Sequence, residues 1–273
     1  MNLNELIFFS SFIALIIAML AIDLGVFNRN SHIVHFKEAL TWSIIWVTCS
    51  LAFYVLIMFH GDWVHGPTSV YDITVLAQKF GHPIMDQINN NAGDLERCLT
   101  IYRQNLALEF LSGYLIEKAL SVDNIFVIIM IFYAFGVDEK YYHRILFWGI
   151  LGAIIMRFVF IFLSAALIQE FDWILYVFGA LLIFTGVKML FAKDEQQNIE
   201  PHKHPIVKMA SKFFRVFPRN LGGKFFVVKN HKFYITPLFI VLLVIEFSDV
   251  IFAVDSIPAI FAITKDPFIV FFS

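Results

Sequence analysis

Long apolar runs recur along the chain, and they limit what it can fold into more than any other feature. About 20 consecutive apolar residues are enough to cross a bilayer as a helix. By that rule, spans are predicted near residues 6–27, 39–60, 105–135, 145–168, 172–192 and 236–264. The composition agrees, because 59% of the 273 residues are hydrophobic and 15% are charged, against about half and a quarter in soluble domains. We therefore expect an all-α polytopic membrane protein.

A seventh apolar run begins at Phe268 and stops at Ser273, the last residue of the sequence. Six residues are too few to cross a bilayer. The fold is therefore expected to have about seven transmembrane helices, of which the seventh is incomplete. The prediction is a single transmembrane transport domain over residues 1–273.

The two long polar segments differ in charge, which predicts the orientation of the chain. Residues 61–104 carry three basic and five acidic side chains, whereas residues 193–235 carry nine basic ones. Because Lys and Arg favour the cytoplasmic side, residues 193–235 are predicted to form a cytoplasmic loop. Residues 61–104 then form an extracytoplasmic loop, and the N-terminus lies outside. The expected location is the cell (inner) membrane.

The stretch EFSDVIFAVDSIP, residues 246–258, places three carboxylates inside the last complete apolar run. A charge at the bilayer centre costs at least about 2.5–3.5 kcal/mol, so such residues are usually functional. Glu246 and Asp249 share a helix face, but Asp255 lies about 180° from Glu246 on a straight helix. Pro258 removes a hydrogen bond to Val254. We therefore expect a break or kink there that turns Asp255 toward the other two acids.

A second acidic stretch pairs with this one. SVDNIFVI at residues 121–128 aligns with FSDVIFAV at residues 247–254, which places Asp123 on Asp249. The two stretches lie on the third and sixth predicted helices, which run in opposite directions. A motif repeated on antiparallel helices is typical of inverted-repeat transporters, whose binding site lies near the membrane midplane.

The two stretches together offer an all-oxygen set of side chains, which suits a hard cation such as Mn²⁺, Mg²⁺ or Ca²⁺. Crowded carboxylates repel one another, and a divalent cation or protons would offset that repulsion. Exchange of metal for protons is one consequence. The predicted metal ligands are Glu117, Asp123, Asn124, Glu246, Asp249 and Asp255.

The acidic residues could also have a purely structural role instead of binding an ion. Lys118, Arg157 and Lys188 lie in or near spans and could neutralise the acids in an ion-pair network. Asp23 and Glu109 are candidates either for a gate or for an interfacial helix end. The loop histidines, His60, His65 and His82 among them, are expected to be solvated.

Other functional classes also remain as alternatives to transport. An intramembrane aspartyl-type hydrolase using Asp123 and Asp249 is one, although the glycine-flanked pattern expected of it is missing. A proton or cation channel and a membrane scaffold are two more. We expect no enzyme, no nucleic-acid partner, and a divalent ion and the bilayer as the partners.

The sequence resembles the TerC family of integral membrane proteins. The resemblance is carried by EFLSGYLIEKALSVDNIFVIIMIF at 109–132 and EFSDVIFAVDSIPAIFAIT at 246–264, and AIDLGVFNRNSHIVHFKEAL at 21–40 is similar too. It implies manganese export, a link to tellurite resistance and a relation to LysE-type exporters. It also implies that all six predicted ligands match the family pattern, and that Mn²⁺ is the transported ion.

Overall fold

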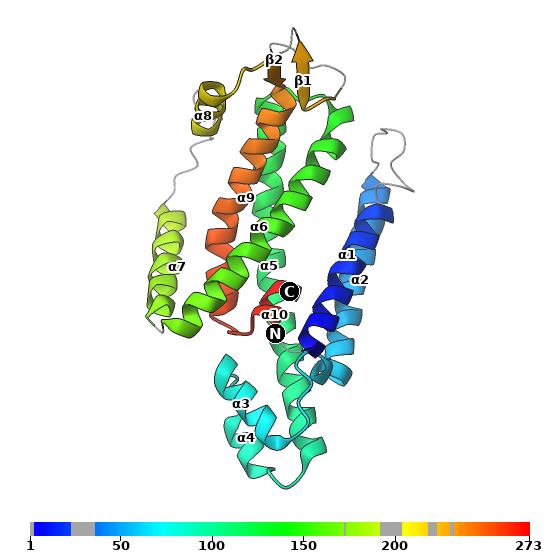
Figure 1. Cartoon of the computed structure of the whole chain (residues 1–273), viewed down its shortest axis with the longest axis vertical. Coiled ribbons are helices and arrows are strands. Elements are labelled where there is room, and N and C mark those ends of the chain that lie inside the picture. Colours follow the sequence, from blue (N-terminus) through cyan, green and yellow to red (C-terminus); the bar gives the residue numbers. More distant parts are fainter. Residues whose placement is uncertain (1–2, 23–35, 172, 192–203, 218–222, 230–231) are drawn as a thin grey trace. The chain divides into compact units, whose positions relative to one another are not determined.

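The computed structural model describes residues 3–22, 36–171, 173–191, 204–217, 223–229 and 232–273, and almost all of them are helical (Figure 1). Clustering of backbone contacts gives two compact units. One comprises Met1–Glu117 with Ile260–Ser273, and the other comprises Lys118–Ala259. The elements are α1 (Leu3–Ile22), α2 (Phe36–His60), η2 (Gly61–Trp63), α3 (Val70–Phe80), α4 (Met85–Asn90), α5 (Leu95–Ala134), η3 (Glu139–Tyr141), α6 (Tyr142–Glu170), α7 (Ile174–Phe191), α8 (Pro205–Phe213), β1 (Phe226–Lys229), β2 (Lys232–Ile235), α9 (Pro237–Phe261) and α10 (Pro267–Phe272).

Among the described residues, three helical stretches are long and apolar enough to cross a membrane: Leu40–Trp63, Glu139–Glu170 and Pro237–Phe261. Glu5–Ala18 and Ile174–Lys188 are shorter apolar helices. These helices agree with the prediction of a mostly helical membrane protein. Seven spans and the inverted repeat stay predictions.

The core of the first unit contains a cluster of phenylalanine rings from four helices. Phe12 of α1 packs on Phe272 of α10 with ring centroids 4.5 Å apart. Phe53 of α2 lies 5.8 Å from Phe272 and 5.2 Å from Phe110 of α5. Aromatic pairs at such separations contribute about 0.5–1.5 kcal/mol beyond burial of their area. The short apolar helix α10 is thereby held against α1 and α2.

The polar segment 61–104 is largely helical. Ser69 starts α3 with a capping box, in which its side chain accepts a hydrogen bond from the backbone of Asp72. Gly81 ends the helix with φ +68, a conformation that suits glycine. The next helix, α5, begins at Leu95 rather than at the predicted residue 105. The prediction was too late because it followed hydropathy alone, whereas buried Cys98 and Tyr102 already line one face there.

The core of the second unit is built from the end of α5, the start of α6 and α9. Ile131, Ile145, Leu238, Val241 and Ile245 are among its buried members. Within the predicted basic loop, the described residues form α8 and an antiparallel hairpin of β1 and β2. The sequence patterns did not predict this hairpin.

Candidate functional site

The two acidic motifs face one cavity in the second unit. Asn124 of α5 and Asp249 of α9 both line a cavity of about 80 Å³, whose wall on α6 includes Gly149 and Ala153. An amide and a carboxylate are the oxygen donors that hard cations prefer. One residue from each motif therefore contributes a polar side chain to the same, otherwise apolar, cavity.

Glu246 lies against the backbone of α6 at Gly152. A Cβ atom on Gly152 would collide with both carboxylate oxygens of Glu246. The absence of a side chain at residue 152 thus makes the space that the carboxylate occupies. Sequence analysis alone assigned no role to this glycine.

Two basic residues compensate the acids of α9. Arg157 of α6 places Nη2 3.7 Å from Oδ1 of Asp249. The other carboxylate oxygen of Asp249 is buried and makes no hydrogen bond to any described residue. Lys188 of α7 lies close enough to Asp255 to interact with it electrostatically. The pairing of Asp249 with Arg157 agrees with the ion-pair reading of that arginine, whereas Lys118 is simply exposed.

The expected break at Pro258 is absent, because α9 is a continuous helix from Pro237 to Phe261. The prediction of a break was wrong: proline deletes one backbone hydrogen bond, and neighbouring helices can support the helix around it. Pro258 is buried and lines a cavity of about 140 Å³ with Ser164 of α6 and Phe178 of α7. On an unbroken helix Asp255 stays about 180° from Glu246.

The full set of six predicted ligands stays a prediction. Within the described parts of the chain, no group of three or more His, Cys, Asp or Glu side chains is placed to hold a metal ion. Asp123 is exposed, and Glu117 belongs to the first compact unit. Asp23 lies outside the described residues.

Glu109, a candidate gate residue, is buried in the first unit with His82. The Nδ1 atom of His82 lies 2.7 Å from Oε1 of Glu109, and Asn105 donates a hydrogen bond to the same oxygen at 2.7 Å. The prediction of a solvated His82 was wrong, because the ring is covered by Phe80 and Tyr102.

His65 is also buried rather than solvated, between two carboxylates. Its Nδ1 lies 3.0 Å from Oε1 of Glu5, and its Nε2 lies 2.8 Å from Oδ2 of Asp266. Burial lowers the pKa of His65, but the charges of Asp266 and Glu5 and their hydrogen bonds outweigh burial and raise it to about 9. Because the partners are 60 and 201 residues away in sequence, no local pattern could have revealed this group.

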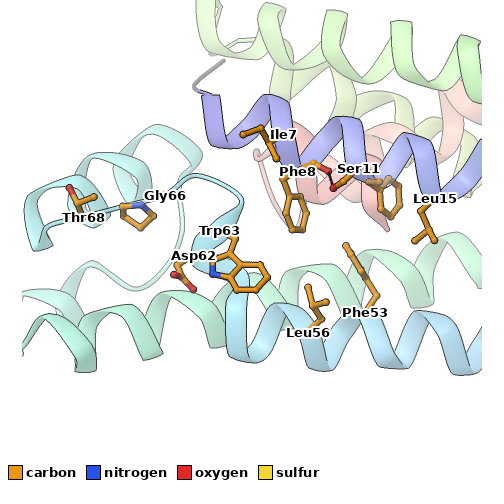
Figure 2. A pocket seen from close by; sticks show the side chains of 12 residues that line it. Ile7, Phe8, Ser11, Leu15, Phe53, Leu56, Asp62, Trp63, Gly66 and Thr68 are labelled. Carbon is orange, nitrogen blue, oxygen red and sulfur yellow. Dashed lines mark hydrogen bonds between the residues drawn. The ribbon is translucent and has the colours of Figure 1, made fainter.

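A groove of about 780 Å³ lies elsewhere in the first unit, along α1 and the end of α2. Figure 2 shows Phe8, Leu15 and Leu56 among its apolar walls, with Asp62 and Thr68 toward one end. Asp62 is the one carboxylate among the described residues that line it, and it already pairs with Nε of Arg103 at 2.6 Å. The groove does not gather ligands for an ion.

Comparison with known proteins agrees with these features. The family model described as "Integral membrane protein TerC family" matches residues 102–273. An "Uncharacterized membrane protein STKORF319" of Myxococcus xanthus is 42% identical over 97% of this chain and 69% of its own length. The "Putative membrane-bound redox modulator Alx" of Escherichia coli (strain K12) is 42% identical over 95% of this chain and 70% of its own.

A third relative, an "Uncharacterized membrane protein" of Rickettsia bellii, is 37% identical over 96% of this chain and 72% of its own length. No solved structure matches the chain. The family match covers both acidic motifs and more than half of the sequence, and the relatives align over nearly all of it. On this evidence the chain belongs to the TerC family of integral membrane proteins.

Proposed function

We propose that this protein exports a divalent metal cation, Mn²⁺, from the cytoplasm by secondary-active transport in exchange for protons. The observation that carries the proposal is the shared cavity, which Asn124 and Asp249 line from different acidic motifs. The proposed ligands of the transported ion are Glu117, Asp123, Asn124, Glu246, Asp249 and Asp255.

The chemistry of the donors supports a hard cation. Carboxylate and amide oxygens bind Mn²⁺, Mg²⁺ and Ca²⁺ in preference to softer metals. Manganese is chosen among these because of the resemblance to the TerC family. The ion is the cargo and leaves the protein at the end of each cycle, so the ligands need to come together only in part of that cycle.

In this proposal, Arg157 and Lys188 neutralise the negative charges of Asp249 and Asp255 when no cation is bound. The 3.7 Å separation between Arg157 and Asp249 is long for a salt bridge, and a buried charge that loses its partner is costly. An entering cation repels Arg157 and takes over the neutralisation of Asp249. When the cation leaves, protons or Arg157 compensate the carboxylates again.

The proposal includes a topology. The chain contributes to a fold of seven spans with an inverted repeat, in which α5 and α9 carry the two copies of the motif. The N-terminus lies outside the inner membrane, and residues 193–235 lie in the cytoplasm. Alternating access would take place about α5 and α9.

The test is cellular manganese content in a host that lacks its own exporters. Asp249→Asn and Asp123→Asn keep the side-chain shape and remove the charge, so we expect manganese to rise several-fold over cells with the wild-type protein. Asp86→Asn in α4, which changes an exposed carboxylate, is the matched control and should export normally. Export by both motif variants at the wild-type rate would refute the site.

The Arg157–Asp249 pair supports a second candidate, a membrane scaffold whose acids only stabilise the bundle. In that case Asp249→Asn lowers the amount of protein in the membrane, because the half-buried Arg157 loses its ion pair with Asp249. Immunoblots of the membrane fraction separate the two functions. Normal protein level with lost export supports transport, and lost protein level supports the scaffold.

A further inference from the structure

The buried histidine of the first unit holds together three segments that are distant in sequence. Glu5 belongs to α1, His65 follows η2, and Asp266 precedes α10. All three are buried. Asp266 also starts α10, because its Oδ1 accepts a hydrogen bond from the backbone N–H of Phe268 at 2.9 Å. We call Glu5, His65 and Asp266 the clasp.

Counting hydrogens shows that the clasp contains an extra proton. Each of its two hydrogen bonds, at 3.0 and 2.8 Å, needs one hydrogen between a ring nitrogen and a carboxylate oxygen. A neutral imidazole carries only one N–H, and ionised carboxylates accept but cannot donate. The second hydrogen must therefore be a bound proton, either on the ring as imidazolium or on a carboxyl group.

Tyr102 is buried near the clasp, among other titratable groups of the first unit. Burial raises the pKa of Tyr102 well above its ordinary value, and the charges of Asp266, Glu109, Glu5 and Asp62 raise it further. His82 lies next to Tyr102 and is engaged with Glu109. Arg103 is held by Asp62. Among the described residues, Tyr102 of α5 interacts electrostatically with Asp266 and Glu5 of the clasp, and the titratable groups around Tyr102 are Glu109 of α5, Asp62 of η2, and His82 between α3 and α4.

Nearby buried atoms also have unused hydrogen-bonding capacity. Nε2 of His82, the hydroxyl of Tyr102 and Oε2 of Glu109 make no hydrogen bond to any described residue. These groups can accept or pass a proton, or hold a water that does so. The clasp therefore adjoins groups through which its proton can exchange.

We propose that the clasp is a proton-binding site that fastens α1 and the start of α10 to the segment after η2 and releases them when its proton is lost at alkaline pH. It is separate from the acidic motifs and does not depend on metal transport. After deprotonation, the neutral ring can serve only one of its two carboxylates. The other buried carboxylate then loses its hydrogen bond to the ring, which favours local opening.

Two substitutions distinguish proton binding from simple packing. Asp266→Asn lets a neutral ring keep both bonds, since Nδ1–H donates to Glu5 while Nε2 accepts from the new amide. Its amide oxygen can still cap α10, because asparagine is a good N-cap. His65→Gln cannot reach both carboxylates with a donor and should loosen the clasp at every pH.

The experiment uses the full chain, labelled with ¹⁵N-histidine and placed in lipid nanodiscs, and follows the imidazole signals from pH 5 to pH 11. The signal lost in His65→Gln should titrate at least two pH units above the ordinary histidine value of 6.5. Asp266→Asn should lower its midpoint by at least one pH unit and leave the unfolding temperature at pH 7.5 unchanged. If Asp266→Asn does not fold, Glu5→Gln makes the same test at the other ring nitrogen, Nδ1 of His65.

The opening itself is measured by thermal unfolding at pH 7.5 and pH 10. The wild-type protein should unfold at a lower temperature at pH 10, and Asp266→Asn should lose this dependence. The proposal is overturned if His65 titrates near the ordinary histidine value of 6.5. It is equally overturned if Asp266→Asn leaves both the midpoint and the alkaline loss of stability unchanged.

Discussion

Replacing Gly152 by alanine tests the placement of Glu246 directly. The new methyl group would occupy the space that the carboxylate of Glu246 fills on α6. Overpacking of this kind costs about 1–3 kcal/mol, whereas glycine to alanine in a helix is worth about 1 kcal/mol in favour of the variant. We therefore expect a net destabilisation of up to about 2 kcal/mol, because the carboxylate must move.

Gly149→Ala is the matched control on the same helix. A methyl group there would lie 3.5 Å from Cγ2 of Ile245, which is an ordinary contact. This variant should be as stable as the wild-type protein or gain up to about 1 kcal/mol from the helix propensity of alanine. Thermal unfolding of the purified proteins in one detergent compares the two.

A double variant identifies the cause. Gly152→Ala combined with Glu246→Ala removes the colliding carboxylate, so the destabilisation caused by the first change should disappear in the Glu246→Ala background. Such coupling between contacting residues is about 0.5–3 kcal/mol. If Gly152→Ala is as stable as Gly149→Ala, or if the two changes are additive, the carboxylate does not lie against Gly152.

Four further predictions concern the first unit. The pKa of His65 is raised from 6.5 to about 9, which corresponds to about 3 kcal/mol of stability against unfolding. This contribution is complete below pH 6.5, declines as the pH rises and is lost above pH 9. Unfolding temperatures measured across that range test it. Ser69→Ala removes the cap of α3 and should cost about 1 kcal/mol, seen as faster amide exchange in that helix; unchanged exchange would contradict the cap. Hydrogen bonds from Thr68, and then from Ser69, lower the pKa of Asp72. The ionised Asp72 therefore stabilises α3 above pH 3.8, and this stabilisation disappears as the pH falls through the lowered pKa. An acid titration that follows the helicity of α3 measures the loss. Gly81→Ala should destabilise the same helix end by about 1 kcal/mol because its φ is positive, and a wild-type melting temperature would argue against that strain.

Much of the architecture followed from short-range patterns. Hydropathy predicted the long apolar helices, and α9 lies almost where the run 236–264 placed it. The capping box of Ser69 and the positive φ of Gly81 are equally local, because each depends on residues within one turn. The start of α5 was misplaced because polar residues on one face concealed buried residues on the other.

The candidate site was partly accessible from sequence. The acidic motifs singled out six candidate ligands, and two of them, Asn124 and Asp249, line one cavity. Arg157 was an expected ion-pair partner and does approach Asp249. The role of Pro258 was misjudged, since a helix in a packed bundle can tolerate one missing hydrogen bond without breaking.

The sequence by itself determined the class of the protein, its main helices and the acids that could bind a cation, because hydrophobicity and helix periodicity are properties of neighbouring residues. Only the tertiary structure decided which partner each charge meets. Glu246 fits against Gly152, and His65 lies between Glu5 and Asp266. Such contacts join segments that can be about 200 residues apart, and burial makes each of them energetically decisive by removing the water that would otherwise solvate the charge.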